Sequence, residues 1–202
     1  MSPAQPEGGP LPGAGELPEA VRASSAAPGA APRPFCVYLH VPYCRVRCGY
    51  CDFNTYTNLD MGPGASAGDF VGTLAGELAL AAAAMDRAGL PRRRARTVFV
   101  GGGTPTVLPA GDLVRMLDLV RRTWGLAPGA EVTTEANPET VDERYLATLA
   151  RAGFTRVSIG MQSAVPRVLA VLDRAHTPER VPLVVDSSWR SEERRVGKEC
   201  RS

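Results

Sequence analysis

Apolar and polar positions repeat in four blocks between residues 35 and 172. Each block opens with a short strand pattern, at 35–41, 97–100, 131–135 and 154–160, and continues with apolar residues three or four positions apart. The helical stretches are expected from the N-cap Asp69 to the stop at Gly89, then at 112–124, 141–152 and from 165 onward, with Gly153 ending the third. Strand–helix units in series predict an α/β fold with a parallel sheet and right-handed crossovers.

The motifs that interrupt this pattern all follow a strand. Cysteines follow the first strand, a glycine run the second, Asn137-Pro138 the third and Gln162-Ser163 the fourth. In parallel sheets and barrels the carboxyl ends of the strands carry the chemistry. We therefore expect the four motifs to meet at one end of the fold.

The composition of the chain excludes several classes of protein. The chain has 202 residues, 44% of them hydrophobic and 22% charged, which suits one globular domain. The longest apolar run, 78–85, is far shorter than the roughly 20 residues of a membrane span, and the N-terminus lacks the pattern of a secretory signal. The formal charge of +2 comes from residues 190–202, so the body is neutral. We expect a cytoplasmic protein with no membrane span and no nucleic-acid partner.

The two ends differ in composition from the middle of the chain. Residues 1–34 are rich in Pro, Ala and Gly and have almost nothing large to bury, which predicts a disordered arm. Residues 182–202 lose the strand–helix pattern, and the charged string from Arg190 resembles a translated adaptor remnant or else a solvated tail. The folded core is therefore expected at 35–181, and Trp189 and Cys200 are expected to carry no function.

Three of the five cysteines lie close together, at Cys44, Cys48 and Cys51. An odd number cannot pair completely, and clustered cysteines usually bind metal. Three thiolates can each hold one iron of a cubane cluster and leave the fourth iron open. Structural zinc is the alternative, but it usually needs a second cysteine pair, and neither Cys36 nor His40 is well placed as a fourth ligand.

These motifs resemble the radical S-adenosylmethionine (SAM) superfamily, and within it the oxygen-independent coproporphyrinogen III oxidase-like family. The resemblance rests on YLHVPYCRVRCGYC (38–51), FVGGGTPT (99–106), TEANPE (134–139), VSIGMQS (157–163) and LDRAH (172–176). It implies a partial (β/α) barrel, usually of six units followed by a C-terminal domain. About four units are visible here, so the fold is expected to be truncated.

The resemblance also implies the site. The three cysteines would hold a [4Fe-4S] cluster whose open iron takes the amino and carboxylate groups of SAM, and one electron would then cleave a C–S bond of SAM to give a 5′-deoxyadenosyl radical. The methionine end of SAM would meet Gly102, Gly103 and Thr104, where glycines let the backbone approach the ligand. The rest of the SAM pocket would be Tyr38, Tyr50, Glu135, Gln162 and Arg174. His40 and His176 are expected to be structural.

Two functions exist within this family. The oxidase decarboxylates coproporphyrinogen III, whereas the other branch is a heme chaperone that binds heme and delivers it to acceptor proteins, with an electron donor implied for both. Oxidases tend to have a fourth cysteine where this chain has Phe53, and an acidic residue where it has Asn137. These two positions favour the chaperone branch. The motifs do not decide whether that branch cleaves SAM, and therefore whether the protein is an enzyme. The alternatives are the oxidase and a non-functional fragment that lacks the heme-binding segment and seats a cluster only weakly.

Overall fold

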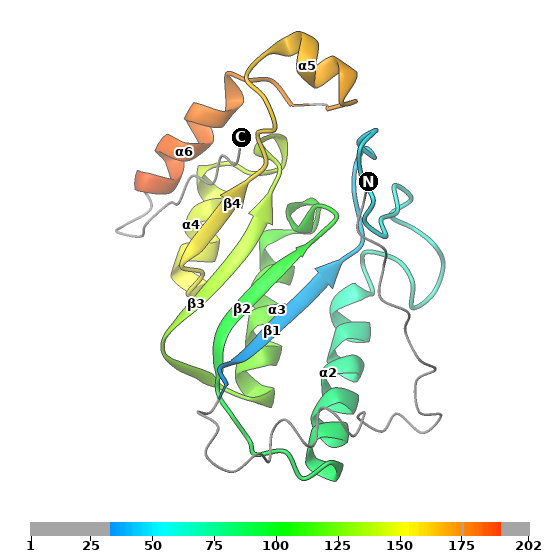
Figure 1. The fold of residues 1–202 in the computed structure, drawn as a ribbon, viewed down its shortest axis with the longest axis vertical. Helices are drawn as coiled ribbons and strands as arrows, with labels where there is room; N and C mark the ends of the chain where they lie inside the picture. Colours follow the sequence, from blue (N-terminus) through cyan, green and yellow to red (C-terminus); the bar gives the residue numbers. More distant parts are fainter. Residues whose placement is uncertain (1–32, 175, 191–202) are drawn as a thin grey trace.

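Four parallel strands build one sheet in the computed structural model, which describes residues 33–174 and 176–190 (Figure 1). The strands are β1 (Phe35–Val41), β2 (Ala95–Gly102), β3 (Leu126–Ala136) and β4 (Arg156–Ile159), and they lie in chain order. At the carboxyl ends Val41 pairs with Gly102, and Ala136 pairs with Ile159. The segments that follow the strands therefore start close together, as the sequence predicts.

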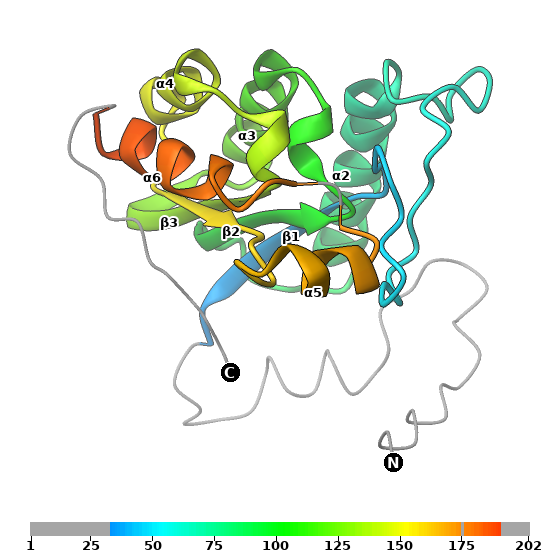
Figure 2. The same cartoon turned by 90° about the horizontal axis from the view of Figure 1, so that it is seen from above.

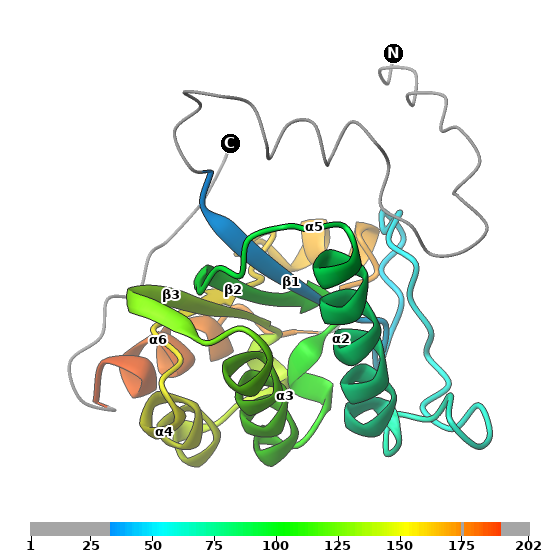
Figure 3. The same cartoon turned by 90° about the horizontal axis from the view of Figure 1, so that it is seen from below.

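Helices cover one face of this sheet. α2 (Phe70–Arg87), α3 (Ala110–Thr123) and α4 (Glu143–Ala152) lie side by side on that face, as Figures 2 and 3 show from opposite sides. Successive crossovers in the same direction keep the helices on one face and start a barrel rather than a doubly wound sheet. The predicted class, α/β with the arrangement of a partial barrel, is confirmed by this topology.

The remaining elements gather near the carboxyl ends of the strands. The short 3-10 helices η1 (Pro105–Val107) and η2 (Pro138–Thr140) directly follow β2 and β3. α5 (Pro166–Val171) lies beyond the arrowheads of the strands, and α6 (Arg180–Arg190) lies beside α4 (Figure 1). These elements, with the cysteine loop after β1, surround the site described below.

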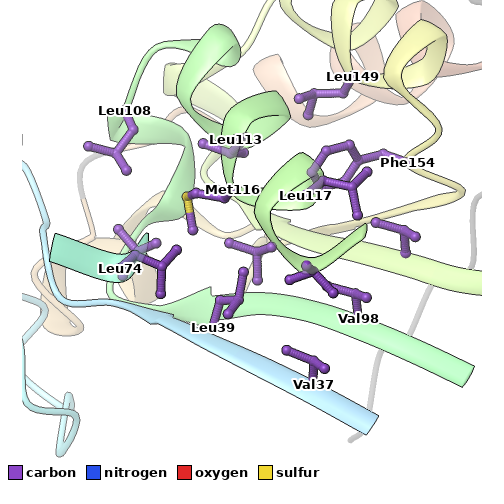
Figure 4. Packing of buried hydrophobic residues seen from close by; sticks show 14 of the residues in the cluster. Val37, Leu39, Leu74, Val98, Leu108, Leu113, Met116, Leu117, Leu149 and Phe154 are labelled. Atoms are coloured by element: carbon purple, nitrogen blue, oxygen red, sulfur yellow. The ribbon is translucent and has the colours of Figure 1, made fainter. Parts of the chain in front are cut away.

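The core lies between the sheet and the three covering helices. α3 contributes Leu113, Met116 and Leu117, which lie three and four positions apart and are all 0% exposed. They face Leu39 of β1 and Val98 of β2 (Figure 4). This packing explains why the periodic apolar positions of the sequence predict the helix faces correctly.

Both ends of α4 follow local capping rules, whereas the start of α2 does not. The Asp142 side chain accepts a hydrogen bond from the backbone N–H of Tyr145 at 2.7 Å and so caps α4, and Gly153 ends α4 in the left-handed region at φ 100°. Asp69 occupies the expected N-cap position of α2, but its side chain does not cap the helix. It accepts instead from the backbone N–H of Gly64 at 2.9 Å and so orders the preceding loop.

The expected end of the core at residue 181 falls inside α6. Val184 is 2% exposed and packs with Val141 and Leu146, so the folded part extends past that boundary. Expectations for 1–32 and 191–202, Cys200 included, concern residues outside the described part, as does the side chain of Trp189. Within the described part no helix is long and apolar enough to cross a membrane.

Candidate metal and ligand site

A cavity of about 1080 Å³ opens where the four strands end. Segments from every strand end line it, together with the start of α6. Nine of the eleven site residues expected from the sequence lie on its wall: Cys48, Tyr50, Cys51, Gly102, Gly103, Thr104, Glu135, Gln162 and Arg174. The structure thus brings together residues that are far apart in the chain.

The cysteine loop is fixed at both of its ends. The backbone N–H of Cys44 donates to the Tyr56 carbonyl at 2.9 Å, and the N–H of Tyr56 donates to the Pro42 carbonyl at 2.7 Å. Inside the loop the Cys51 N–H donates to the Cys48 carbonyl at 3.0 Å. The three cysteines carry free thiols, and their loop is held directly against the strand ends.

Cys44 lies just behind the cavity wall, beneath the glycine run. The Thr104 hydroxyl donates to the Cys44 Sγ at 3.6 Å, and the Gly103 N–H donates to the Val41 carbonyl at 2.8 Å. A Cβ atom at Gly103 would lie 2.6 Å from the Tyr43 carbonyl oxygen and 2.9 Å from the Cys44 Sγ. Burial raises the pKa of the Cys44 thiol, and the bond from Thr104 opposes that rise. Because an added Cβ would be this close to Tyr43 and Cys44, only glycine at position 103 lets the glycine run approach the cysteine loop.

The spacing of the possible metal ligands bears on the choice between a zinc ion and an iron–sulfur cluster. Among the described residues no three His, Cys, Asp or Glu side chains gather closely enough to hold one metal ion. A single zinc ion with bonds of about 2.3 Å requires such gathering. A cubane binds each cysteine at a different iron and so accepts more widely spaced sulfur atoms. Cys48 and Cys51 on the cavity wall and Cys44 just behind it thus supply three free thiols on one loop, without the close set of ligands that a single zinc ion requires among the described residues.

Glu135 is the last residue but one of β3 and faces the glycine run. Its Oε2 accepts a hydrogen bond from the Gly102 N–H at 3.2 Å. Gly102 has φ 112°, and a Cβ atom there would lie 2.7 Å from the His40 Nδ1. Burial raises the pKa of the Glu135 carboxyl, while the Gly102 N–H and His40 act in the opposite direction. The cavity thus has a carboxylate that holds only one hydrogen-bond donor among the described residues.

Tyr38 lies next to the cavity but not on its wall. The side chain is 55% exposed, stacks on Phe99 with ring centroids 6.0 Å apart, and has its hydroxyl 3.0 Å from the His40 Nδ1. The other ring nitrogen of His40 lies 3.1 Å from the Asn54 carbonyl oxygen. Because a carbonyl only accepts, the His40 Nε2 carries the proton, and in the neutral ring Nδ1 accepts from the tyrosine. The prediction that His40 is structural agrees with these contacts.

Arg174 spans the cavity between the cysteine loop and β4. Its Nη1 donates to the Cys48 Sγ at 3.2 Å, and its Nη2 donates to the Gly160 carbonyl at 3.1 Å. Its Nε is buried without a hydrogen-bond partner in the described residues. Gln162 lies nearby on the wall with φ 55°, a backbone conformation that non-glycine residues rarely adopt. Both residues stand where the sequence motifs predict a ligand.

Sequence reasoning missed one part of the cavity wall. Val181 and Val185 of α6 line the cavity, and their helical spacing was the available signal. Away from the wall, the Glu139 Oε1 accepts from the backbone N–H and the hydroxyl of Thr177, at 3.1 and 3.2 Å, and so anchors the segment that follows Arg174. His176, next to this contact, is buried, as expected for a structural histidine, but neither ring nitrogen has a hydrogen-bond partner in the described residues.

Several known proteins are similar to this chain in sequence. The chain is 54% identical over 156 residues to "Heme chaperone HemW" of Mycobacterium tuberculosis strain H37Rv, covering 76% of this chain and 38% of the relative. It is 38% identical over 146 residues to the Escherichia coli protein of the same name, covering 72% and 36%. It is 35% identical over 141 residues to the mitochondrial "Radical S-adenosyl methionine domain-containing protein 1" of Bos taurus, covering 70% and 30%. The chain therefore spans less than two fifths of the length of these relatives.

The fold has a match among solved structures. Coproporphyrinogen III oxidase from Escherichia coli superposes with a TM-score of 0.70 at 24% identity, covering 85% of this chain and 37% of the oxidase. At that identity the match concerns the fold alone. The model of the "Radical SAM superfamily" matches residues 38–183, which include all four strand ends and the whole cysteine loop. The chain therefore belongs to the radical SAM superfamily.

Proposed function

We propose that this chain is the cluster- and SAM-binding part of a heme chaperone. The observation that carries the proposal is the convergence of Cys48, Cys51, Glu135 and Arg174 on one cavity. The relatives named heme chaperone support the choice of function. In this proposal heme is the cargo, a heme-binding protein is the acceptor, and the protein works in the cytoplasm, where thiols stay reduced.

The cysteines are proposed to hold a [4Fe-4S] cluster through Cys44, Cys48 and Cys51. Three thiolates would leave one iron without a protein ligand, and SAM would bind at that iron. When bound, the cluster and SAM supply one-electron chemistry, with an electron donor as a further partner. The residues of this chain hold the loop in place, shield Cys44 behind Gly103 and Thr104, and leave the other two cysteines at the cavity.

The wall of the cavity offers complementary groups for SAM. The Glu135 carboxylate can accept hydrogen bonds from the cationic amino group or the ribose, and Arg174 and Gln162 add donors across the cavity. The backbone of Gly102 and Gly103 lies on the same wall, where it would meet the methionine end of SAM. Tyr50 belongs to the same wall, whereas Tyr38 would contact SAM only from the rim.

Two positions favour the chaperone over the oxidase. Phe53 and Asn137 both line the cavity, at the places where oxidases of this family tend to have a cysteine and an acidic residue. An apolar ring and a neutral amide there remove a fourth thiolate and a negative charge from the site. We therefore propose that decarboxylation of coproporphyrinogen III is not the activity of this protein.

Cluster binding is tested by anaerobic reconstitution of the 202-residue chain with iron and sulfide. We expect about four iron and four sulfide per chain, and a change in the EPR spectrum of the reduced cluster when SAM is added. Cys48→Ala should lose the cluster. Cys36→Ala is the matched control, because Cys36 is exposed on β1 and should leave the iron content unchanged. Equal iron in the two variants would refute the assignment of the cysteines.

Function is tested on the reconstituted chain with two substrates in parallel. Hemin titration followed by absorbance should show saturable binding, and incubation with coproporphyrinogen III and SAM should release no carbon dioxide. Release of carbon dioxide together with 5′-deoxyadenosine would instead establish the oxidase. A chain that binds the cluster and SAM but neither hemin nor coproporphyrinogen III would instead support the third alternative, a fragment without the heme-binding segment.

A further inference from the structure

The guanidinium of Arg174 makes a contact that ligand binding alone does not explain. Its Nη1 donates to the Sγ of Cys48 at 3.2 Å, although the two residues are 126 positions apart. We infer that Arg174 acts through Cys48 to raise the reduction potential of the cluster, in addition to any contact with SAM. The inference rests on the proposed function, because it requires that Cys48 binds iron.

The position of Arg174 is fixed from both sides. On the N-terminal side the Leu172 carbonyl accepts from the Gly49 N–H at 3.2 Å, which joins this segment to the cysteine loop itself. On the C-terminal side Thr177 donates to Glu139, and the Arg180 Nη2 donates to the Val141 carbonyl at 2.8 Å. The contact with Cys48 is therefore part of a braced segment and does not depend on a freely moving side chain.

The three cysteines have unequal surroundings. Cys48 receives a hydrogen bond from a cation, Cys44 receives one from the neutral Thr104 hydroxyl at 3.6 Å, and no hydrogen bond in the described residues reaches the Cys51 sulfur. Arg47 also belongs to the loop, but it is exposed and donates to the Cys51 carbonyl oxygen. Arg174 is thus the cation in direct contact with a ligand sulfur.

The direction of the effect follows from charge. Reduction adds one electron to the cluster, which dithionite supplies, and no bond forms or breaks in that step. A hydrogen bond from a cation to a ligand sulfur stabilises the added negative charge and so favours the reduced state. Because the guanidinium is partly buried, solvent screens it less than it screens the exposed arginines. Loss of Arg174 should therefore make the cluster harder to reduce.

The test is a redox titration of the reconstituted 202-residue chain without SAM, followed by EPR. Arg174→Gln removes the charge and should shift the midpoint potential to more negative values. Arg174→Lys keeps the charge without the planar fork and should give a smaller shift in the same direction. Arg167→Gln is the matched control, since Arg167 is an exposed residue of α5. The midpoint potential of the cluster in this variant should equal that in the parent chain.

The outcomes separate this inference from the proposed function. If both Arg174 variants bind four iron, bind SAM more weakly and keep the parental potential, Arg174 only contacts SAM and the inference is overturned. If Arg174→Gln fails to take up iron, the midpoint potential of Arg174→Lys becomes the test. A potential equal to that of the parent chain would then also overturn the inference. If the parent chain itself takes up no cluster, the proposed function fails instead, which the iron content reports before any titration.

Discussion

The Oε2 of Glu135 accepts a hydrogen bond from the backbone N–H of Gly102 at 3.2 Å, and this contact joins the end of β3 to the end of β2. It places a half-buried carboxylate beside backbone that has no side chain to cover it. If Glu135 binds a cationic ligand as proposed, this arrangement keeps the carboxylate available for that ligand, at a cost in stability when no ligand is bound. Function and stability are therefore expected to respond in opposite directions to changes at Glu135.

Glu135→Gln tests this opposition. Burial raises the pKa of the carboxyl above its ordinary value of 4.5, so the folded state binds the proton more tightly than the unfolded state. The resulting loss of stability is absent below pH 4.5 and grows as the pH rises through the folded-state pKa. At pH 7 the glutamine variant should unfold at a higher urea concentration than the parent.

The same variant should bind SAM more weakly. Loss of a charged hydrogen-bond acceptor costs about 1.5–3 kcal/mol, which corresponds to a roughly 10- to 150-fold rise in Kd. Glu179→Gln, at an exposed position, should change neither quantity. A glutamine variant with lower stability and parental SAM affinity would contradict the assigned role of Glu135.

Gly103→Ala should disrupt cluster binding without altering the core. The added Cβ would meet the Tyr43 carbonyl and the Cys44 Sγ at 2.6 and 2.9 Å, closer than real contacts allow, and backbone cannot move aside cheaply. We expect the variant to retain clearly less iron after desalting than the parent chain. Gly111→Ala is the control, because nothing lies within 4 Å of its added atom, and it should retain the parental amount.

Leu113→Ala should lower the free energy of unfolding by about 2–5 kcal/mol, because the side chain is fully buried between α3 and the sheet. Leu80→Ala makes the same chemical change on α2 at a position that is 70% exposed and should stay within about 0.5 kcal/mol. Urea denaturation followed by circular dichroism compares the two. Similar losses in both variants would show that the assigned core face is wrong.

His176 should make stability depend on pH below neutrality. Burial lowers the pKa of its imidazole from 6.5, Arg174 lowers it further, and Glu139 opposes both. Because the unfolded chain takes up the proton first, stability is full above pH 6.5 and falls as the pH drops through the folded-state pKa. His176→Leu should make the free energy of unfolding depend less on pH below pH 6.5. A slope equal to that of the parent would remove His176 as the cause.

Local rules account for what the sequence could predict. The periodic apolar positions located the covering helices, and the caps at Asp142 and Gly153 follow from residue type and neighbours a few positions away. Asp69 stands at the expected N-cap position, yet its carboxylate accepts a hydrogen bond from the Gly64 N–H and none from the first turn of α2. Backbone N–H groups of the loop and of the helix compete for the same carboxylate, and the residue type alone does not show which of them it will bind.

Contacts across long separations account for most of what the sequence could not predict. The motifs placed Arg174 in the pocket, but its bond to Cys48 depends on how the segment after α5 returns to the cysteine loop. The position of Tyr38 at the rim depends on the neighbouring strand that carries Phe99. α6 was missed for a different reason: no strand pattern precedes it, so the helical spacing of its valines, Val181, Val184 and Val185, did not indicate a further strand–helix unit.

The bond between Gly49 and Leu172 also sets an order of events during synthesis. The cysteine loop leaves the ribosome early, while the segment that braces it, with Arg174, lies 126 residues after Cys48. At a translation rate of about 5–20 residues per second, Arg174 is synthesised roughly 6–25 s after Cys48. Iron delivered earlier than that would meet a loop held only by its own bonds to Pro42 and Tyr56, without the contacts of the later segment. If the three cysteines hold the proposed cluster, we therefore expect its iron to be inserted only after the fourth strand and the Arg174 segment have formed.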